Sequence, residues 1–161
     1  MRAVFGYSAL ALGAVALDQW IKALVEEHLV MHQAVDILPF FALYRTYNTG
    51  VAFSMLSGAG DLPLIALSIA VIAFVLFLAA RSTTDQAIAR TGFALIVGGA
   101  IGNLIDRSLL GHVIDYFLFH TPVWSFAVFN LADVFISVGA AMVVLQEFLH
   151  WVRERGARRG D

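Results

Sequence analysis

Residues 62–80 read LPLIALSIAVIAFVLFLAA, a run without one charged side chain. An α-helix rises about 1.5 Å per residue, so this run is long enough to cross the roughly 30 Å hydrocarbon core of a bilayer. An unbroken apolar stretch of this length is typical of a transmembrane helix. It therefore predicts that the chain is an integral membrane protein.

The composition of the whole chain agrees with this class. Hydrophobic residues make up 60% of the 161 positions and charged residues 14%, whereas soluble domains have roughly 45–50% and about 25%. The formal net charge of −2 gives no basic footprint for a nucleic acid. The chain has no cysteine, which excludes disulfides, thiolate catalysis and thiolate metal sites.

Three further apolar segments lie at about 3–25, 91–110 and 125–149. Each span needs about 20 residues, so four spans and their connections use almost the whole length. We therefore predict an all-α membrane protein, a single integral membrane domain over residues 1–161 with four transmembrane helices.

The first segment also has features of a secretory signal peptide. Arg2 precedes it, and Ala14-Val-Ala16 resembles a cleavage site. The apolar pattern continues to Val25, beyond that point, which favours a span.

Basic residues mark one side of the predicted bundle. Arg2 precedes the first span, Arg81 and Arg90 flank the connection between the second and third, and more arginines crowd the tail at 150–161. Those tail arginines are Arg153, Arg155, Arg158 and Arg159. Because these places share one side of a four-span protein, both termini are expected in the cytoplasm. We interpret the tail as an anchor at lipid headgroups, with a partner-binding role as the alternative.

Polar residues recur near the predicted outer ends of three spans. They are Asp18 and Lys22 on the first, Asn103, Asp106 and Arg107 on the third, and Asn130 and Asp133 on the fourth. At about 1.5 Å per residue, each group lies within roughly 10 Å of the outer surface. Spacings of three and four residues place each group on one helix face. The sequence thus predicts that three helices bring polar side chains to one depth.

These polar groups have two possible roles, interhelical contacts or function. Asp18 and Lys22 can neutralise each other, and both roles stay open for that pair. Asp133 has no basic residue near it in the sequence, and an ionised carboxylate in a span costs at least ~2.5 kcal/mol. Asp115 stands between apolar neighbours in the second outer connection. The two aspartates are therefore candidate functional residues.

Two other features bear on the fold. Residues 98–102 read GGAIG, a small-xxx-small pattern that favours close helix packing. The first outer connection, about 26–61, is rich in aromatic and β-branched residues and is broken by Asn48-Thr-Gly50. This pattern predicts a small extracytoplasmic β-rich region between spans one and two.

Five short motifs occur in order along the chain. They are DQWIK at 18–22, NTGVAFS at 48–54, GGAIGNLIDR at 98–107, VIDYF at 113–117 and FNLAD at 129–133. In sequence and spacing they closely resemble the motifs of the lipoprotein signal peptidases, or signal peptidase II, a family of bacterial intramembrane aspartyl proteases. Val51 departs from the family's frequent alanine, which puts nothing catalytic in doubt.

The resemblance implies a role for each matching residue. Asp115 and Asp133 would be the catalytic pair. The residues expected to bind substrate or support the site are Asp18, Lys22, Asn48, Gly99, Asn103, Arg107 and Asn130. The implied substrate is a diacylglyceryl-modified prolipoprotein, cleaved before its lipidated cysteine by a monomeric enzyme in the bacterial inner membrane. Membrane lipids are the other expected partners, and no metal or cofactor is implied.

The residue types also fit this chemistry without the family. Two neighbouring carboxylates cannot both ionise easily, so the pair holds one base and one acid for activating water. No G-x-S-x-G or H-E-x-x-H motif occurs. The alternatives are a metal held by His112, Asp115 and His120, an ion-coupled transporter or channel subunit, and a structural subunit with polar helix contacts.

Overall fold

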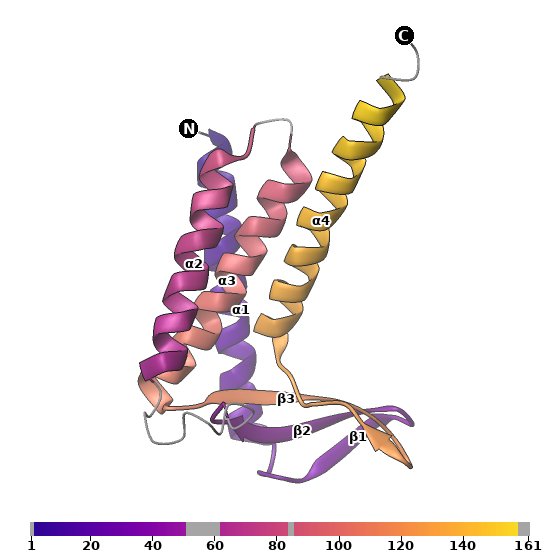
Figure 1. The fold of residues 1–161 in the computed structure, drawn as a ribbon. Coiled ribbons are helices and arrows are strands. Elements are labelled where there is room, and N and C mark those ends of the chain that lie inside the picture. Colours follow the sequence, from indigo (N-terminus) through magenta and orange to yellow (C-terminus); the bar gives the residue numbers. More distant parts are fainter. Residues whose placement is uncertain (1, 51–61, 84–85, 158–161) are drawn as a thin grey trace.

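The computed structural model describes residues 2–50, 62–83 and 86–157. Val51 and the rest of the motif at 51–54, together with Arg158 and Arg159 of the tail, lie outside the described residues. The elements in chain order are α1 (Arg2–His28), β1 (Ala34–Leu38), β2 (Phe41–Asn48), α2 (Leu62–Arg81), α3 (Ala87–Leu110), β3 (Val113–Thr121), β4 (Trp124–Ser125) and α4 (Leu131–Ala157). The helices form a bundle, and the strands form a small sheet at one end of it (Figure 1).

All four helices are long and apolar enough to cross a membrane. Large apolar side chains of α2 point away from the rest of the bundle: Phe74 is 60% and Phe77 53% exposed. A soluble protein rarely leaves so large an apolar face in contact with water. A lipid environment accounts for this exposed apolar face. A helix is stable there because its backbone polar groups are hydrogen-bonded within the helix.

Helix α3 lies at the centre and packs against each of the other three helices. Its glycines allow this approach: a Cβ on Gly98 would lie 2.8 Å from the Cβ of Ala14 on α1. A Cβ on Gly92 would lie 2.5 Å from the carbonyl oxygen of Gly139 on α4. The close helix packing predicted from the small residues is confirmed.

The sheet has the strand order β1-β2-β3-β4, and every neighbouring pair is antiparallel. Strand β2 pairs with β3, so that Thr46 lies opposite Asp115 and Asn48 opposite Val113. The β-rich region was expected only between the first two spans, but the connection between α3 and α4 supplies β3 and β4. Strand β3 covers one edge of β2 and satisfies backbone groups that would otherwise be unpaired.

The fourth helix begins later than the expected residue 125. Residues 126–129 precede the helix, and Phe129 forms a bridge with Phe117 of β3. Helix α4 starts at Leu131, so Asn130 is not on the helix but immediately before it. The apolar side chains of this segment contact the aromatic residues of the sheet, and Phe119 and Phe129 stack with ring centroids 5.8 Å apart.

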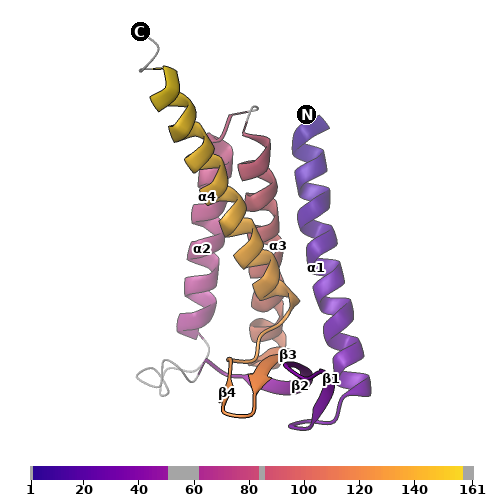
Figure 2. The same ribbon diagram turned by 90° about the vertical axis from the view of Figure 1, so that its right-hand side faces the viewer.

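Both views place the two termini and the α2–α3 connection at the end of the bundle opposite the sheet (Figures 1 and 2). A buried cluster of Val25, Ile114 and Tyr116 joins the last turns of α1 to β3. The sheet is thus packed firmly against the helix ends, where the polar residues also lie.

Candidate active site

Asp115 lies on β3 with only 2% of its surface exposed. Its Oδ2 accepts a hydrogen bond from Nδ2 of Asn48 at 3.0 Å, and its Oδ1 accepts one from Nδ2 of Asn130 at 2.7 Å. Asn48 is the last residue of β2, so the pairing of β2 with β3 brings it to this carboxylate. The side chain of Asp115 is therefore held by residues from two other parts of the chain.

The surroundings of Asp115 favour its protonated form. Burial, and after it the negative charge of Asp133, raise the pKa of this carboxyl from its ordinary value to about 6. The amide hydrogen bonds from Asn48 and Asn130 act the other way, because they stabilise the ionised form. The carboxyl is thus poised to hold or release a proton near neutral pH.

Asp133 lies in the first turn of α4 and forms a capping box with Asn130. The Asp133 backbone N–H donates to Oδ1 of Asn130 at 3.0 Å, and the Asn130 N–H donates to Oδ2 of Asp133 at 3.1 Å. Nδ2 of Asn103, on α3, donates to Oδ1 of Asp133 at 2.8 Å. The helix start thereby fixes this carboxylate, which is only partly buried.

Asn130 connects the two aspartates. It is completely buried, its Nδ2 donates to Asp115, and its main chain and Oδ1 engage Asp133. Its Nδ2 also lies 3.0 Å from Oδ1 of Asn103, which continues the network toward α1. The two carboxylates thus belong to one hydrogen-bonded unit, although they come from different elements.

Behind this unit lies a buried ion cluster centred on Lys22. Its Nζ lies 2.8 Å from Asp18 Oδ2 and 2.7 Å from Asp106 Oδ2, and it donates to Asn103 Oδ1 at 3.1 Å. Lys22 and Asp106 are each 2% exposed and Asp18 is completely buried. All three ammonium protons have acceptors, as a buried lysine requires.

The two carboxylates of this cluster also hold the backbone next to the candidate catalytic aspartates. Oδ1 of Asp18 accepts a hydrogen bond from the Ala132 N–H at 3.0 Å, one residue before Asp133. Oδ2 of Asp106 accepts one from the Ile114 N–H at 3.2 Å, one residue before Asp115. The cluster joins helices and at the same time positions the candidate site. The two roles left open for Asp18 and Lys22 are therefore not exclusive.

Two predicted site residues lie apart from this network. Gly99 faces α4, where a Cβ would collide with the carbonyl oxygen of Ala132, so its place in the structure is to let α3 and α4 approach closely. Arg107 lies in the last turn of α3 and is partly buried. Its Nε is buried without a hydrogen-bond partner among the described residues.

Several supporting residues were not among the predicted site residues. Nε2 of Gln19 donates to Oδ1 of Asp106 at 2.8 Å, and the Tyr116 hydroxyl accepts a hydrogen bond from the Leu131 N–H at 3.2 Å. The sequence places Asp106 among the polar residues at the outer end of the third span but does not predict a role for it in the site. Its spacing of three from Asn103 indicated the shared face, but its partner Ile114 lies on a strand that local pattern did not predict.

Arg45 anchors the sheet to α1. Its Nη1 donates to the carbonyl oxygen of Glu26, in the last turn of α1, at 2.9 Å and to that of Leu29, just after α1, at 3.2 Å. The Tyr47 hydroxyl donates to the Glu26 carboxylate at 2.9 Å, and the Tyr47 ring stacks on His112. These contacts fix β2, the strand that carries Asn48 to Asp115. The only sequence feature that could have indicated this contact is the single arginine within an aromatic strand.

The metal alternative finds no geometric support. Within the described ranges, no group of three or more His, Asp or Glu side chains is placed to hold a metal ion. His112 instead packs against Tyr47, with ring centroids 3.8 Å apart. His120 lies near the exposed carboxylate of Asp36, at 3.4 Å.

The fold and the site define a multi-pass membrane protein with two linked carboxylates at one end of its helix bundle. Comparison with known families makes this specific. The family model described as signal peptidase (SPase) II matches residues 10–149, and the chain belongs to this peptidase family.

Curated relatives and solved structures agree with this family. The lipoprotein signal peptidase of Mesorhizobium japonicum is 62% identical over 96% of this chain and 92% of its own length. That of Brucella ovis is 56% identical over 95% of this chain and 96% of its own length. A bacterial membrane enzyme solved by the in meso method at 1.9 Å resolution superposes with a TM-score of 0.79, covering 88% of this chain and 92% of that one. At 22% identity, this likeness shows the fold alone.

Proposed function

We propose that the chain is an intramembrane aspartyl endopeptidase that removes the signal peptide from diacylglyceryl-modified prolipoproteins, cutting before the lipidated cysteine. The observation that carries the mechanism is the joint contact of Asn130 with Asp115 and Asp133. Family membership and relatives named lipoprotein signal peptidase support the substrate class.

The two aspartates take different roles in this mechanism. In the active pair one carboxyl carries a proton and the other does not; the raised pKa of Asp115 assigns the proton to Asp115 and leaves Asp133 as the base. Asp133 takes a proton from water as the water oxygen bonds to the scissile carbonyl carbon, and Asp115 gives its proton to the carbonyl oxygen. Asp133 then delivers its proton to the amide nitrogen as the C–N bond breaks, while Asp115 recovers a proton from the diol. Both carboxyls return to their starting states.

The remaining site residues hold this pair or the substrate. Asn48, Asn103 and Asn130 fix the carboxylates, while Asp18 and Lys22 position the backbone beside them. Gly99 lets α3 approach α4. Arg107, whose Nε has no partner within the described part of the chain, would hold a carbonyl of the substrate peptide.

The proposal includes an orientation. The arginine-rich ends of the helices, opposite the sheet, face the cytoplasm, and the sheet and the aspartate pair lie at the outer surface of the bacterial inner membrane. The acyl chains of a lipid-modified substrate would then stay in the bilayer while its scissile bond reaches the interface. Residues 1–161 would act as one membrane domain and as a monomer.

The test is cleavage by the purified chain reconstituted in lipid. Mixed with a synthetic diacylglyceryl-modified precursor peptide, the protein is expected to release a signal peptide fragment that mass spectrometry identifies. The same peptide without the lipid is the control and should be cleaved much more slowly. A transporter or a structural subunit would leave the mass of both peptides unchanged.

The pH profile of cleavage should be bell-shaped. As pH rises through about 6, Asp115 loses the proton that it must donate, so kcat/KM should fall on the alkaline side. On the acidic side, kcat/KM should fall because the pair then binds two protons and has no base left to activate water. Asn48→Ala removes a hydrogen bond that lowers the pKa of Asp115 and should move the alkaline limb to higher pH.

Gln33→Ala provides the matched control, because it removes an exposed amide outside the site. Its profile should equal that of the unmodified protein. Identical profiles for Asn48→Ala and Gln33→Ala would contradict the role assigned to Asp115.

The orientation can be checked with single cysteines, since the chain has none of its own. Val123, in the β3–β4 turn, is 95% exposed, and Thr83 lies in the connection between α2 and α3. On intact spheroplasts, a membrane-impermeant maleimide should label Val123→Cys, and it should label Thr83→Cys only after lysis. The reverse pattern would place the aspartate pair on the cytoplasmic side.

A further inference from the structure

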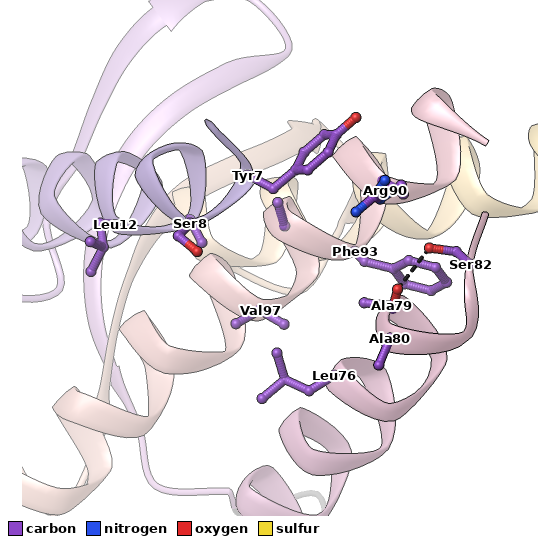
Figure 3. Close-up of a pocket in the computed structure, with 12 residues that line it drawn as sticks. Tyr7, Ser8, Leu12, Leu76, Ala79, Ala80, Ser82, Arg90, Phe93 and Val97 are labelled. Atoms are coloured by element: carbon purple, nitrogen blue, oxygen red, sulfur yellow. Dashed lines mark hydrogen bonds between the residues drawn. The ribbon is translucent and has the colours of Figure 1, made fainter. Parts of the chain in front are cut away.

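A cavity of about 630 Å³ lies between α1, α2 and α3, toward the end of the bundle opposite the aspartate pair. Helix α3 forms its floor, and α1 and α2 form opposite walls (Figure 3). The mechanism above makes no use of this cavity. Its apolar lining includes Leu12, Leu76 and Val97.

The polar groups of the cavity gather at the end nearest the termini. Tyr7 and Ser8 come from the start of α1, Ser82 follows α2, and Arg90 lies in the first turn of α3. The Arg90 guanidinium lies 5.0 Å from the centroid of the Tyr7 ring (Figure 3). Arg81, the last residue of α2, is not part of the lining, because its guanidinium lies over the ring of Phe77, outside the cavity. The cavity is therefore amphipathic, with an oily interior and a cationic mouth.

We propose that this cavity binds an anionic phospholipid, with one acyl chain between the helices and the phosphate at Arg90. The apolar walls match an acyl chain, and the Arg90 guanidinium matches a negatively charged headgroup at the membrane surface. The same positive charge argues against the substrate's signal peptide as occupant, because the n-region of such a peptide is itself positive. The proposal goes beyond the peptidase function.

Native mass spectrometry of the full chain released from detergent micelles can test the selectivity. The probes are phosphatidylglycerol and phosphatidylcholine with identical acyl chains. We expect phosphatidylglycerol to be retained preferentially, and Arg90→Gln to weaken that binding by about fivefold, as one headgroup charge contact implies. Ala80→Phe, which adds bulk to the cavity lining, should weaken the binding of both lipids.

Arg153→Gln is the matched control. It removes an exposed arginine of α4 toward the same end of the molecule but outside the cavity lining, so phosphatidylglycerol binding should not change. Equal retention of the two lipids, or an equal loss in Arg90→Gln and Arg153→Gln, would overturn the proposal.

Competition identifies the occupant. A synthetic signal peptide that displaced the lipid, and bound more tightly to Arg90→Gln than to the unmodified chain, would assign the cavity to the substrate and also overturn the proposal. In detergent without added phospholipid, Arg90→Gln is expected to cleave the lipid-modified peptide at the unmodified rate. A failure of the peptidase assay alone would leave the lipid measurements unaffected, so the two proposals can be judged separately.

Discussion

Asp115→Asn is expected to abolish cleavage of the lipid-modified peptide. The amide keeps the shape of the carboxyl group but cannot supply the acidic proton, and loss of a general acid–base group lowers the rate by about 10²–10⁴-fold. The fold should survive, because the exposed Asn48 can turn its amide to suit the new partner, which costs one hydrogen bond, that from the Gly50 N–H. Single-turnover cleavage and thermal unfolding, measured on the same preparation, separate the two effects.

Asp36→Asn is the control, since it changes another strand aspartate whose side chain is 71% exposed. Its cleavage rate should equal that of the unmodified chain. Asp133→Asn should also be inactive, but it is a less clean test. Its donors are the Asn130 backbone N–H, which cannot turn, and the amide of Asn103, whose oxygen is held by Lys22. The double variant should be no slower than either single one, as for residues that act as a unit. Turnover by purified Asp115→Asn would refute the aspartyl mechanism.

Lys22→Met should destabilise the protein by about 3–5 kcal/mol, the usual penalty for removing one partner of a buried ion pair. The ammonium group is the shared partner of Asp18 and Asp106, so its loss leaves two buried carboxylates facing each other. The free energy of unfolding, measured by denaturant titration in mixed micelles, gives the size of the effect. Cleavage should fall as well, because these carboxylates hold the backbone beside the proposed catalytic pair.

A second substitution tests the electrostatic cause. Adding Asp106→Asn to Lys22→Met removes one of the unpaired charges and should restore part of the lost stability. The matched control, Arg153→Met, removes an exposed cation and should change stability by no more than about 0.5 kcal/mol. If Lys22→Met were as stable as Arg153→Met, the ion cluster would not contribute to folding as proposed here.

The helices were largely predictable from the sequence because a bilayer imposes length and apolarity on each segment separately. The expected segment at 62–80 lies within the helix Leu62–Arg81. The predicted start of α4 was wrong because apolar residues at 126–129 are equally compatible with a span and with packing on the sheet. The better signal was Asn130 three positions before Asp133, a spacing that suits a capping box.

The site was partly predictable for the same reason. Asp18, Lys22 and Asn103 could be placed at one depth by counting along helices. The position of Asp115 could not be predicted in this way, because it depends on the register between β2 and β3, two strands separated in the sequence by α2 and α3. Strand pairing across such a distance follows from the tertiary fold and not from local pattern. The resemblance to signal peptidase II identified Asp115 and Asp133 together before any geometry connected them.

The hydrogen bond between Asp18 and Ala132 joins the first helix to the last across 114 positions of the sequence. A ribosome makes the chain from its N-terminus, so Asp18 enters the membrane long before Ala132 exists. Until α4 follows, Asn103 and Asp115 lack Asn130, and Asp133 has not yet been synthesised. A growing chain therefore lacks the proposed catalytic pair, and we expect it to gain the ability to cleave other membrane-anchored chains only when its final helix is in place.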